Sequence, residues 1–492
     1  MPLINLKLPA GFRNNGTPMD SQGRWTDGSL VRWQQGSMRP VGGWRIRTAS
    51  FMSGAVRAVL PWIDNSRDRW IALADEAKLK VMTSAGLSYD ITPAGLTVGL
   101  PTATVLTGYG NNTYGTSLYG QPRPDNGVFS EATTWSLDTY GQYLVACSNA
   151  DGKLYEWQLN TATPAAQIAN SPINCSGLVV TGERQIMAFG ADGNPRKIAW
   201  CDFEDNTVWT AASTNQAGDT LLQSAGEIMA GVRSRGQTVI LTTTDAWAAT
   251  YVGPPFVFQF SQIGSACGIV SRKAIAATGD RVFWMSNRSF MSYDGSSVTE
   301  VPCEVLDHVF DDINVDQISK CWAMSNSQNN EVWFFYPSAG SDAIDSYAAY
   351  DYAENHWLIG KLARACGADM GVMPQPIMVC TAGNVFDHEI GNGHSGAAVY
   401  ATTGPTQIAN GDNLAVITRL IPDELNLGDV NVSFTTRLYP NAAETSHGPY
   451  SMTNPTSVRL NGRQITMTVT EVNPTSWRVG GMSVETVQGS KR

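Results

Sequence analysis

The residues best suited to chemistry lie in one short segment, VFDHEIGNGH. It holds His388 and His394, with Asp387 and Glu389 beside them. Imidazole and carboxylate groups bind zinc and related metals, but the HExxH spacing that places two histidines on one helix face is absent. The carboxylates follow an apolar run and precede a glycine-rich turn, where accepting backbone N–H bonds is an ordinary role. We therefore predict no metal site, and His388, Glu389 and His394 are the only ligands to consider.

Motifs for catalysis are missing from the rest of the chain. GxSxG, the P-loop and GxGxxG do not occur, and GYGNNTYG has no residue positioned to hold phosphates. Sialidase-like propellers carry repeated Ser-x-Asp-x-Gly-x-Thr-Trp turns, whereas the turn at Ser148–Gly152 lacks the Thr-Trp continuation. We predict no enzyme and no cofactor. A glycan-binding or glycan-degrading β-propeller stays as the alternative, because the spacing of a carboxylate pair is set only in three dimensions.

The elements that would position any such residues are strand–turn–strand units. Each has about five β-branched, aromatic or small apolar residues, then a polar turn, then a second alternating run. The units start near residues 69, 142, 184, 236, 280, 330 and 377. After a first interval of 73 residues, the later intervals of 42 to 52 residues match the roughly 40–50 residues of a four-stranded blade. This pattern predicts an all-β fold, a β-propeller of six to eight blades with additional small β-domains.

Turn and tryptophan residues support the blade interpretation. Asn149-Ala150-Asp151-Gly152 and Asp294-Gly295 are hairpin turns, because glycine accepts positive φ and the Asp or Asn side chain bonds its own backbone. Most units place a tryptophan near the end of a strand, where a large flat ring fills the space between twisted sheets. These tryptophans are Trp157, Trp209, Trp247 and Trp357.

Three domains are expected. Residues 1–50 form an N-terminal arm of short strands, residues 51–404 form the propeller, and residues 405–492 form a C-terminal β-domain. Within the last, VNVSFTTRLYP (430–440) and RQITMTVTEV (463–472) alternate as half-buried antiparallel strands do. The best helix candidate is CEVLDHVFDDI (303–313).

Two aromatic segments are candidates for contact with other chains. The arm carries three tryptophans that need a surface to cover them, and an insertion in the propeller, near 100–130, carries tyrosines paired with glycine on an adaptable backbone. The candidates are Trp25, Trp33, Trp44, Tyr109, Tyr114 and Tyr119. For the tyrosines, packing on the chain's own propeller is an equal alternative.

The charge and composition of the chain limit the classes of partner that it could bind. The net charge of −10, without a long basic run, argues against gripping nucleic acid, which requires clustered Lys and Arg. Only 15% of residues are charged, against about 25% in an average domain, and such a surface suits extensive subunit contacts. The eight scattered cysteines indicate a reduced protein. The absence of a signal-like N-terminus or an apolar run near 18 residues predicts cytoplasmic synthesis without membrane insertion.

Four segments together resemble the tail nozzle or hub proteins of short-tailed bacteriophages, also described as packaged-DNA stabilisation or tail accessory proteins. They are GRWTDGSLVRWQQGSMRPVGGW, the Tyr-Gly insertion, RQIMAFGADGNPRKIAWCDFEDNTVWT (184–210) and SWRVGGMSVETV. The resemblance covers most of the chain, through diffuse motifs and without a catalytic signature. It implies a β-propeller with additional β-domains.

The resemblance also implies a role in the virion tail. Six copies of such a protein form a homohexameric ring below the tail adaptor on the portal side, and the ring contacts tail fibres or spikes. Double-stranded DNA passes through the lumen without sequence-specific binding. The ring closes the channel, retains packaged DNA and opens for ejection. Assembly takes place in the host cytoplasm. No gate motif of the family can be matched to residues of this chain.

Overall fold

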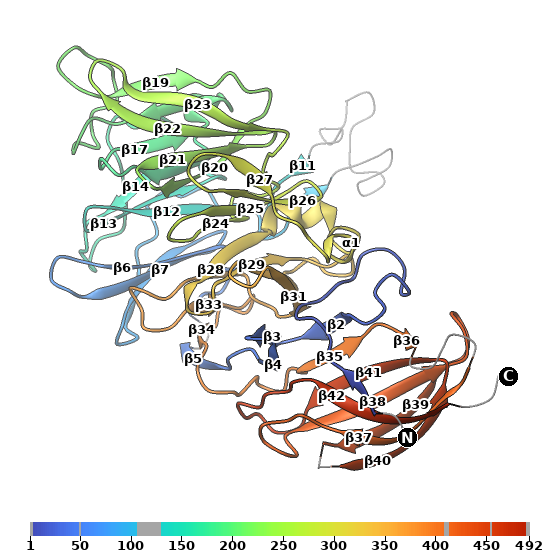
Figure 1. Cartoon of the computed structure of the whole chain (residues 1–492). Coiled ribbons are helices and arrows are strands. Elements are labelled where there is room, and N and C mark those ends of the chain that lie inside the picture. Colours follow the sequence, from blue (N-terminus) through green and yellow to red (C-terminus); the bar gives the residue numbers. More distant parts are fainter. Residues whose placement is uncertain (1–2, 49–50, 106–128, 408–412, 453–454, 489–492) are drawn as a thin grey trace, which may run out of the picture.

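Two β-structured bodies lie side by side in the chain, a propeller and a β-sandwich (Figure 1). The computed structural model describes residues 3–48, 51–105, 129–407, 413–452 and 455–488. The propeller fills the upper part of the view and the sandwich the lower right, so the propeller strands within residues 177–265 lie at the end of the molecule opposite to the sandwich.

Seven four-stranded antiparallel sheets form the blades, numbered here in chain order. Blade 1 contains β6 (Ala58–Ile63), β7 (Arg69–Ala74), β8 (Leu79–Thr83) and β9 (Ser88–Asp90). Blade 2 contains β12 (Trp135–Tyr140), β13 (Tyr143–Ser148), β14 (Leu154–Trp157) and β15 (Ala166–Gln167). Blade 3 contains β16 (Gly177–Val180), β17 (Ile186–Phe189), β18 (Lys197–Trp200) and β19 (Gly218–Leu221). Blade 4 contains β20 (Ile228–Ser234), β21 (Gln237–Thr242), β22 (Asp245–Gly253) and β23 (Val257–Ser265).

The remaining three blades complete the ring. Blade 5 contains β24 (Ile275–Ala277), β25 (Val282–Ser286), β26 (Ser289–Tyr293) and β27 (Val298–Glu300). Blade 6 contains β28 (Trp322–Asn326), β29 (Glu331–Tyr336), β30 (Ser346–Asp351) and β31 (His356–Lys361). Blade 7 contains β32 (Cys366–Ala368), β33 (Ile377–Val379), β34 (Val385–His388) and, from the N-terminal region, β5 (Trp44–Thr48). The first strand of each blade contacts that of the next, and β32 contacts β6, so the ring is closed.

This arrangement confirms the predicted all-β propeller and sets the blade number at seven. Each predicted unit start falls at or within two residues of the second strand of a blade. Nearly all residues of these second strands are buried, and in β29 all six are. In the turn before β14, Gly152 has φ of 69°, and a Cβ there would lie 2.6 Å from Cα of Asn174. A glycine is therefore required where this turn meets the next blade.

The sandwich has two sheets, and both recruit N-terminal strands. One sheet contains β1 (Leu3–Leu6), β42 (Met482–Gln488), β37 (Ala415–Ile421) and β40 (Thr456–Gly462). The other contains β2 (Trp25–Ser29), β35 (Tyr400–Thr403), β41 (Gln464–Glu471), β38 (Val430–Arg437), β39 (Thr445–Ser451) and β36 (Thr406–Gln407). The predicted strands at 430–440 and 463–472 are present as β38 and β41.

The expected separate arm over residues 1–50 is not an independent unit. Its strands β1 and β2 belong to the sandwich, β5 closes blade 7, and β3 (Val31–Gln34) pairs with β4 (Ser37–Pro40) between them. The backbone N–H and C=O groups of these strands need hydrogen-bond partners, and their apolar side chains need a surface to pack against. The neighbouring sheets of both domains provide these partners, so the segment folds into both. The sandwich also begins earlier than residue 405, since β35 is one of its strands.

The remaining elements are few. Helix α1 (Leu306–Phe310) lies within the predicted helical segment. Three short 3-10 helices and the two-stranded antiparallel sheet of β10 and β11 are the other elements of the described residues. They are Ala191–Gly193, Val315–Lys320, Ser327–Asn329, β10 (Thr104–Val105) and β11 (Phe129–Ser130). None of the helices in the described ranges is long and apolar enough to cross a membrane. All eight cysteines are free.

Candidate functional site: the cationic channel of the propeller

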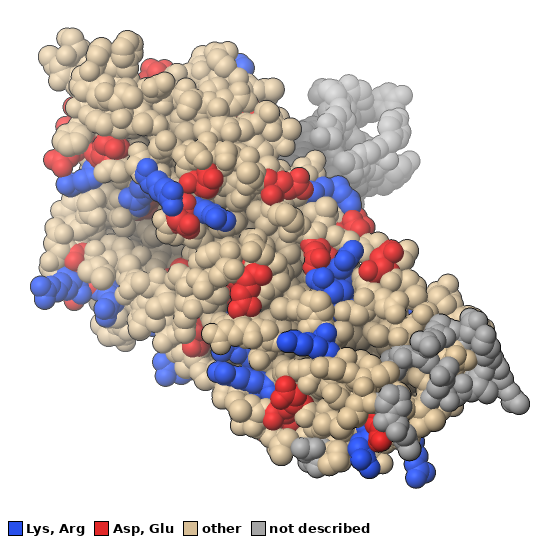
Figure 2. Space-filling model, in the orientation of Figure 1, with Lys and Arg blue, Asp and Glu red and all other residues tan. Residues whose placement is uncertain are grey.

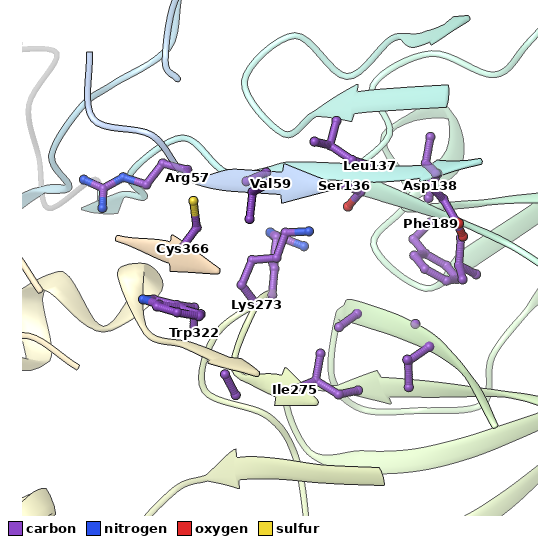
Figure 3. Close-up of a pocket in the computed structure, with 18 of the residues that line it drawn as sticks. Arg57, Val59, Ser136, Leu137, Asp138, Phe189, Lys273, Ile275, Trp322 and Cys366 are labelled. Atoms are coloured by element: carbon purple, nitrogen blue, oxygen red, sulfur yellow. The ribbon is translucent and has the colours of Figure 1, made fainter. Parts of the chain in front are cut away.

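A cavity of about 430 Å³ lies on the axis of the propeller, and residues at the inner strands of all seven blades line it (Figure 3). Aliphatic and aromatic side chains make most of the wall. Five of the lining residues are charged in neutral water: Arg57, Asp138, Arg233, Arg272 and Lys273. Four cations and one carboxylate give this wall an excess of positive charge.

The segment that leads into and out of the Tyr-Gly insertion crosses one end of this channel. The Ala132 backbone N–H, before blade 2, donates to the Ser319 hydroxyl, before blade 6, at 3.4 Å. The Gln317 side chain exchanges two hydrogen bonds with the Ala103 backbone, at 3.1 and 3.0 Å. Blades 2 and 6 are not neighbours in the ring, so these bonds span the channel mouth where the inner strands begin.

Two of the four cations have carboxylate partners. Arg233 pairs with Asp138 at 2.9 Å, and Arg272 lies 3.5 Å from Glu131 and 4.0 Å from Glu227. Burial raises the pKa of Asp138, and Arg233 opposes that shift. Asp138 is the only carboxylate among the lining residues. The carboxylate pair that glycoside hydrolysis requires is therefore missing from the wall of this cavity.

The other two cations have no carboxylate within ion-pair distance in the described part of the chain. Arg57 is 6% exposed, and its Nη2 donates to the Pro101 carbonyl at 2.9 Å, but Nε and Nη1 have no partner among the described residues. Lys273 points toward the middle of the cavity (Figure 3). Desolvation there lowers the pKa of Lys273 to about 8, against the smaller opposing effects of Cys366 and Asp138. Glu76 and Asp138 favour the charged forms of Arg57 and Lys273, respectively, without forming an ion pair with them.

The residues considered as metal ligands have other partners. The Nε2 of His388 accepts a hydrogen bond from Nε of Arg364 at 2.9 Å, and burial and that guanidinium lower the histidine pKa well below its usual value. The Nε2 of His394 lies 2.8 Å from the Val41 carbonyl. Across the described ranges, no three His, Cys, Asp or Glu side chains gather as a metal would need.

Glu389 belongs to a buried ion cluster. One of its oxygens is 2.6 Å from Nη2 of Arg32, while Nε of Arg32 is 2.9 Å from Glu331. Asn326 donates to both carboxylates, at 3.0 and 2.9 Å. Arg32 lies on β3, Asn326 and Glu331 in blade 6 and Glu389 just after β34, so the cluster fastens the N-terminal hairpin to the propeller.

This cluster predicts a pH dependence of stability. Burial raises the pKa of Glu331 to about 7, and the Glu389 charge adds to this, although Arg32 opposes it. A raised pKa in the folded state stabilises the fold below the unfolded pKa, about 4.5, and that contribution is lost as pH rises through 7. We expect the free energy of unfolding of the native chain, measured by urea titration, to decrease as pH rises through 7. In Glu331→Gln this decrease should be absent, because glutamine does not titrate. An unchanged slope in the variant would contradict the assignment.

The aromatic residues predicted to meet other chains fall into two groups. Tyr109, Tyr114 and Tyr119 lie outside the described residues. Trp25 and Trp33 are buried within the chain, with ring centroids 5.9 Å apart, and Phe12 packs edge-on to Trp33 at 5.0 Å. This placement argues against a partner role for these two tryptophans, because the chain itself covers them.

Trp44 is partly buried in blade 7. Its ring lies 5.4 Å from His388 and 5.3 Å from His394, and the Arg364 guanidinium stacks 5.0 Å above it. The structure thus brings together Trp44 and the two histidines, which were predicted for separate roles. Their common function is to seat β5 against β34.

The channel cations were missed by sequence reasoning. A faint signal was present, because Arg57, Lys273 and Arg272 lie about one, two and three residues, respectively, before the first strand of a blade. The predicted units began at the second strand, so the inner strands and the residues before them lay outside the pattern. Only the ring brings these cations to one axis.

Comparison with known proteins adds no functional assignment. No family model matches the chain, and no curated protein matches its sequence. Solved structures similar to it include virginiamycin B lyase from Staphylococcus aureus, at 8% identity and a TM-score of 0.43, over 70% of this chain and 98% of the lyase. The WD40 domain of Neurospora crassa Pan2 has 8% identity and a TM-score of 0.40, over 73% and 95%. The likeness concerns the propeller architecture alone.

Proposed function

We propose that this protein is a structural subunit of a short phage tail, which associates head to tail into the nozzle or hub ring. The observation that carries the proposal is the position of its exposed apolar side chains. Phe256, 78% exposed, lies at the β22–β23 turn of blade 4. Leu425 and Leu427, 67% and 60% exposed, lie in the sandwich between β37 and β38. Blade 4 and the sandwich are at opposite ends of the molecule (Figure 1).

Two different apolar surfaces at opposite ends suit a heterologous contact, in which one end of a copy meets the other end of the next. Such contacts close into a ring when the rotation allows it. The low content of charged residues supports the same proposal, because little charge is desolvated on contact. Figure 2 shows a face on which charged side chains form only small groups of mixed sign. The resemblance to tail nozzle proteins supplies the virion context.

In this proposal DNA passes through the lumen of the ring of subunits. The propeller's own channel is a different space, since 430 Å³ is the volume of a small-molecule pocket. The role is mechanical and not enzymatic, with an adaptor on the portal side and fibres or spikes as further partners. The net negative charge of the chain suits a conduit from which DNA slides without sticking.

Light scattering coupled to size-exclusion chromatography tests this proposal. We expect the chain, alone or mixed with the adaptor of its tail, to give the mass of a closed ring. Phe256→Ser and the double variant Leu425→Ser/Leu427→Ser are expected to shift it to monomer, because each removes one of the two meeting surfaces. Leu87→Ser is the matched control, since Leu87 is 60% exposed in blade 1.

A ring that forms equally well in all three variants would contradict the head-to-tail contact. A native chain that stays monomeric with every tail component would contradict the proposed function itself. Electron micrographs of the assembled species would show whether the ring encloses a lumen.

A further inference from the structure

We propose that a cavity at the junction of the two domains binds a phosphate group, held between the guanidinium groups of Arg39 and Arg478. The cavity has a volume of about 390 Å³ and lies beside the β3–β4 hairpin, which sits between the propeller and the sandwich (Figure 1). Its wall combines residues of this hairpin, of blade 6, of the turn after β34 and of the sandwich segment before β42. The site is separate from the propeller channel and independent of the tail role proposed above.

The strand register places three arginines side by side. Arg32 and Arg39 are Cα partners across the antiparallel pair of β3 and β4. On the other side of β4, Met38 and Val479 exchange two backbone hydrogen bonds of 2.9 Å. In this antiparallel geometry Arg39 and Arg478 are the next opposing pair. Opposing side chains share one face, with Cβ atoms about 4.5–5.5 Å apart, so the three guanidinium groups extend from the same face of these strands.

Only the first of these arginines has carboxylate partners. Arg32 is buried and paired with Glu331 and Glu389. Among the described residues, Arg39 and Arg478 form no ion pair and no side-chain hydrogen bond. Glu389 is the one carboxylate among the described residues of the cavity wall, and Arg32 already occupies it. Two guanidinium groups therefore offer free donors on the wall of one cavity.

These two arginines repel each other unless an anion lies between them. Like charges at opposing positions destabilise a strand pair. Arg39 is half-buried, and burial lowers the pKa of its guanidinium. The charges of Arg32 and Arg478 lower this pKa further, although the two carboxylates of the buried cluster oppose them. Arg478 is exposed, so a ligand can reach the pair from solvent and supply the missing counter-charge.

The chemistry of the donors favours a phosphate group. A guanidinium presents a planar fork of N–H groups that binds phosphate or carboxylate oxygens two at a time. A phosphate monoester carries about −1.5 to −2 charges at pH 7, which balances two arginines, whereas a carboxylate balances only one. The cavity volume lies within the range of small-molecule pockets, roughly 300–1,000 Å³. A small phosphorylated molecule therefore fits as well as the free ion, and Ser476, Gln328 and Asn329 add neutral polar groups to the wall.

Occupation of this cavity would link the two domains. The β3–β4 hairpin is fastened to the propeller through Arg32, whereas Arg478 belongs to the sandwich segment before β42. A ligand that bridges Arg39 and Arg478 contacts both parts. Binding to the folded chain alone is expected to raise the melting temperature as ligand is added.

Isothermal titration of the full chain with glycerol 3-phosphate and, separately, with inorganic phosphate tests the site. Ionic strength is held constant with sodium chloride, and one ligand per chain is expected. Tighter binding of the ester would assign a small phosphorylated molecule as the ligand. Equal or tighter binding of inorganic phosphate would assign the free ion.

Single variants test the two arginines. Arg39→Gln and Arg478→Gln are each expected to weaken binding about tenfold or more, because each removes a charged donor. Arg39→Lys keeps the charge without the planar fork and is expected to lose less affinity. Arg459→Gln is the matched control, because Arg459 is an exposed arginine on β40 of the same sandwich and lies outside the cavity wall.

Chemical labelling provides a second readout if a variant folds poorly. Phenylglyoxal modifies accessible arginines, and the ligand is expected to protect Arg39 and Arg478 but not Arg459, as read by mass spectrometry. Absence of binding at millimolar concentrations of both compounds would overturn the proposal. So would unchanged affinity in either glutamine variant of the pair, or an equal loss of affinity in Arg459→Gln, which would mark general screening of charge.

Discussion

Removal of residues 1–48 is expected to abolish cooperative folding of both domains. The deletion takes β5 from blade 7, where it pairs with β34 through Arg45 and Asp387 and through Trp44 and His388. It also takes β1 from one sandwich sheet and β2 from the other. Unpaired strand edges and exposed apolar faces would remain in both bodies. We expect loss of a sharp thermal transition by circular dichroism and elution as aggregate.

A shorter deletion provides the control. Removing residues 1–10 takes away only β1, an edge strand whose residues are partly exposed, and a folded chain with a lower melting temperature is expected. A peptide of residues 11–48, added during refolding of the longer deletion, is expected to restore part of the transition. If the 1–48 deletion folded cooperatively and lost only assembly, the segment would be an arm for partners, as the sequence alone predicted.

The second large effect is expected from Arg32→Met. Its guanidinium lies between the carboxylates of Glu331 and Glu389, and all three side chains are less than one-tenth exposed. Removing one partner of a buried ion pair typically costs about 3–5 kcal/mol, because it leaves charge without compensation. Here two carboxylates lose the same cation. We expect a loss in the free energy of unfolding at or above the upper part of this range, measured by urea titration at pH 7.

Controls separate the charge effect from a packing effect. Arg39→Met changes the other strand of the same hairpin, where Arg39 forms no ion pair with a described residue, and a loss below about 1 kcal/mol is expected. Adding Glu331→Gln and Glu389→Gln to Arg32→Met is expected to recover part of the stability. The deficit of Arg32→Met should also shrink at acidic pH, as the carboxylates take up protons. A loss no larger than that of Arg39→Met would refute the assignment.

Local patterns account for the accuracy of the blade prediction. The strand that starts at Glu331 reads EVWFFY and is wholly buried, and VNVSFTTR alternates along β38 between buried and half-buried positions. Both patterns depend on neighbours within a hairpin, so a single sequence displays them. The turn at Gly152 is equally local, since it depends on one residue's access to positive φ.

Distant pairings account for what the sequence did not show. In the buried cluster, Arg32 pairs with Glu331 and Glu389, which lie 299 and 357 positions away. No local sequence pattern indicates which carboxylate pairs with which cation. The same holds for Trp25 and Trp33. Whether these side chains are exposed or buried depends on which distant segments of the chain pack against them. The cationic partners of His388 and Glu389, Arg364 and Arg32, lie 24 and 357 positions away, so the segment that holds these two residues does not show them.

By itself the sequence determined the all-β class, the repeat of a propeller, the β-strands of the C-terminal domain and a weakly charged, acidic surface. These follow from hydrophobic period, turn chemistry and composition, each of which is written into short stretches of chain. The tertiary structure alone decided that the ring has seven blades, that β5 closes blade 7, and that residues of all seven blades meet around one cavity. Closure and convergence are properties of the whole ring, because they arise only when strands distant in sequence are brought to one place.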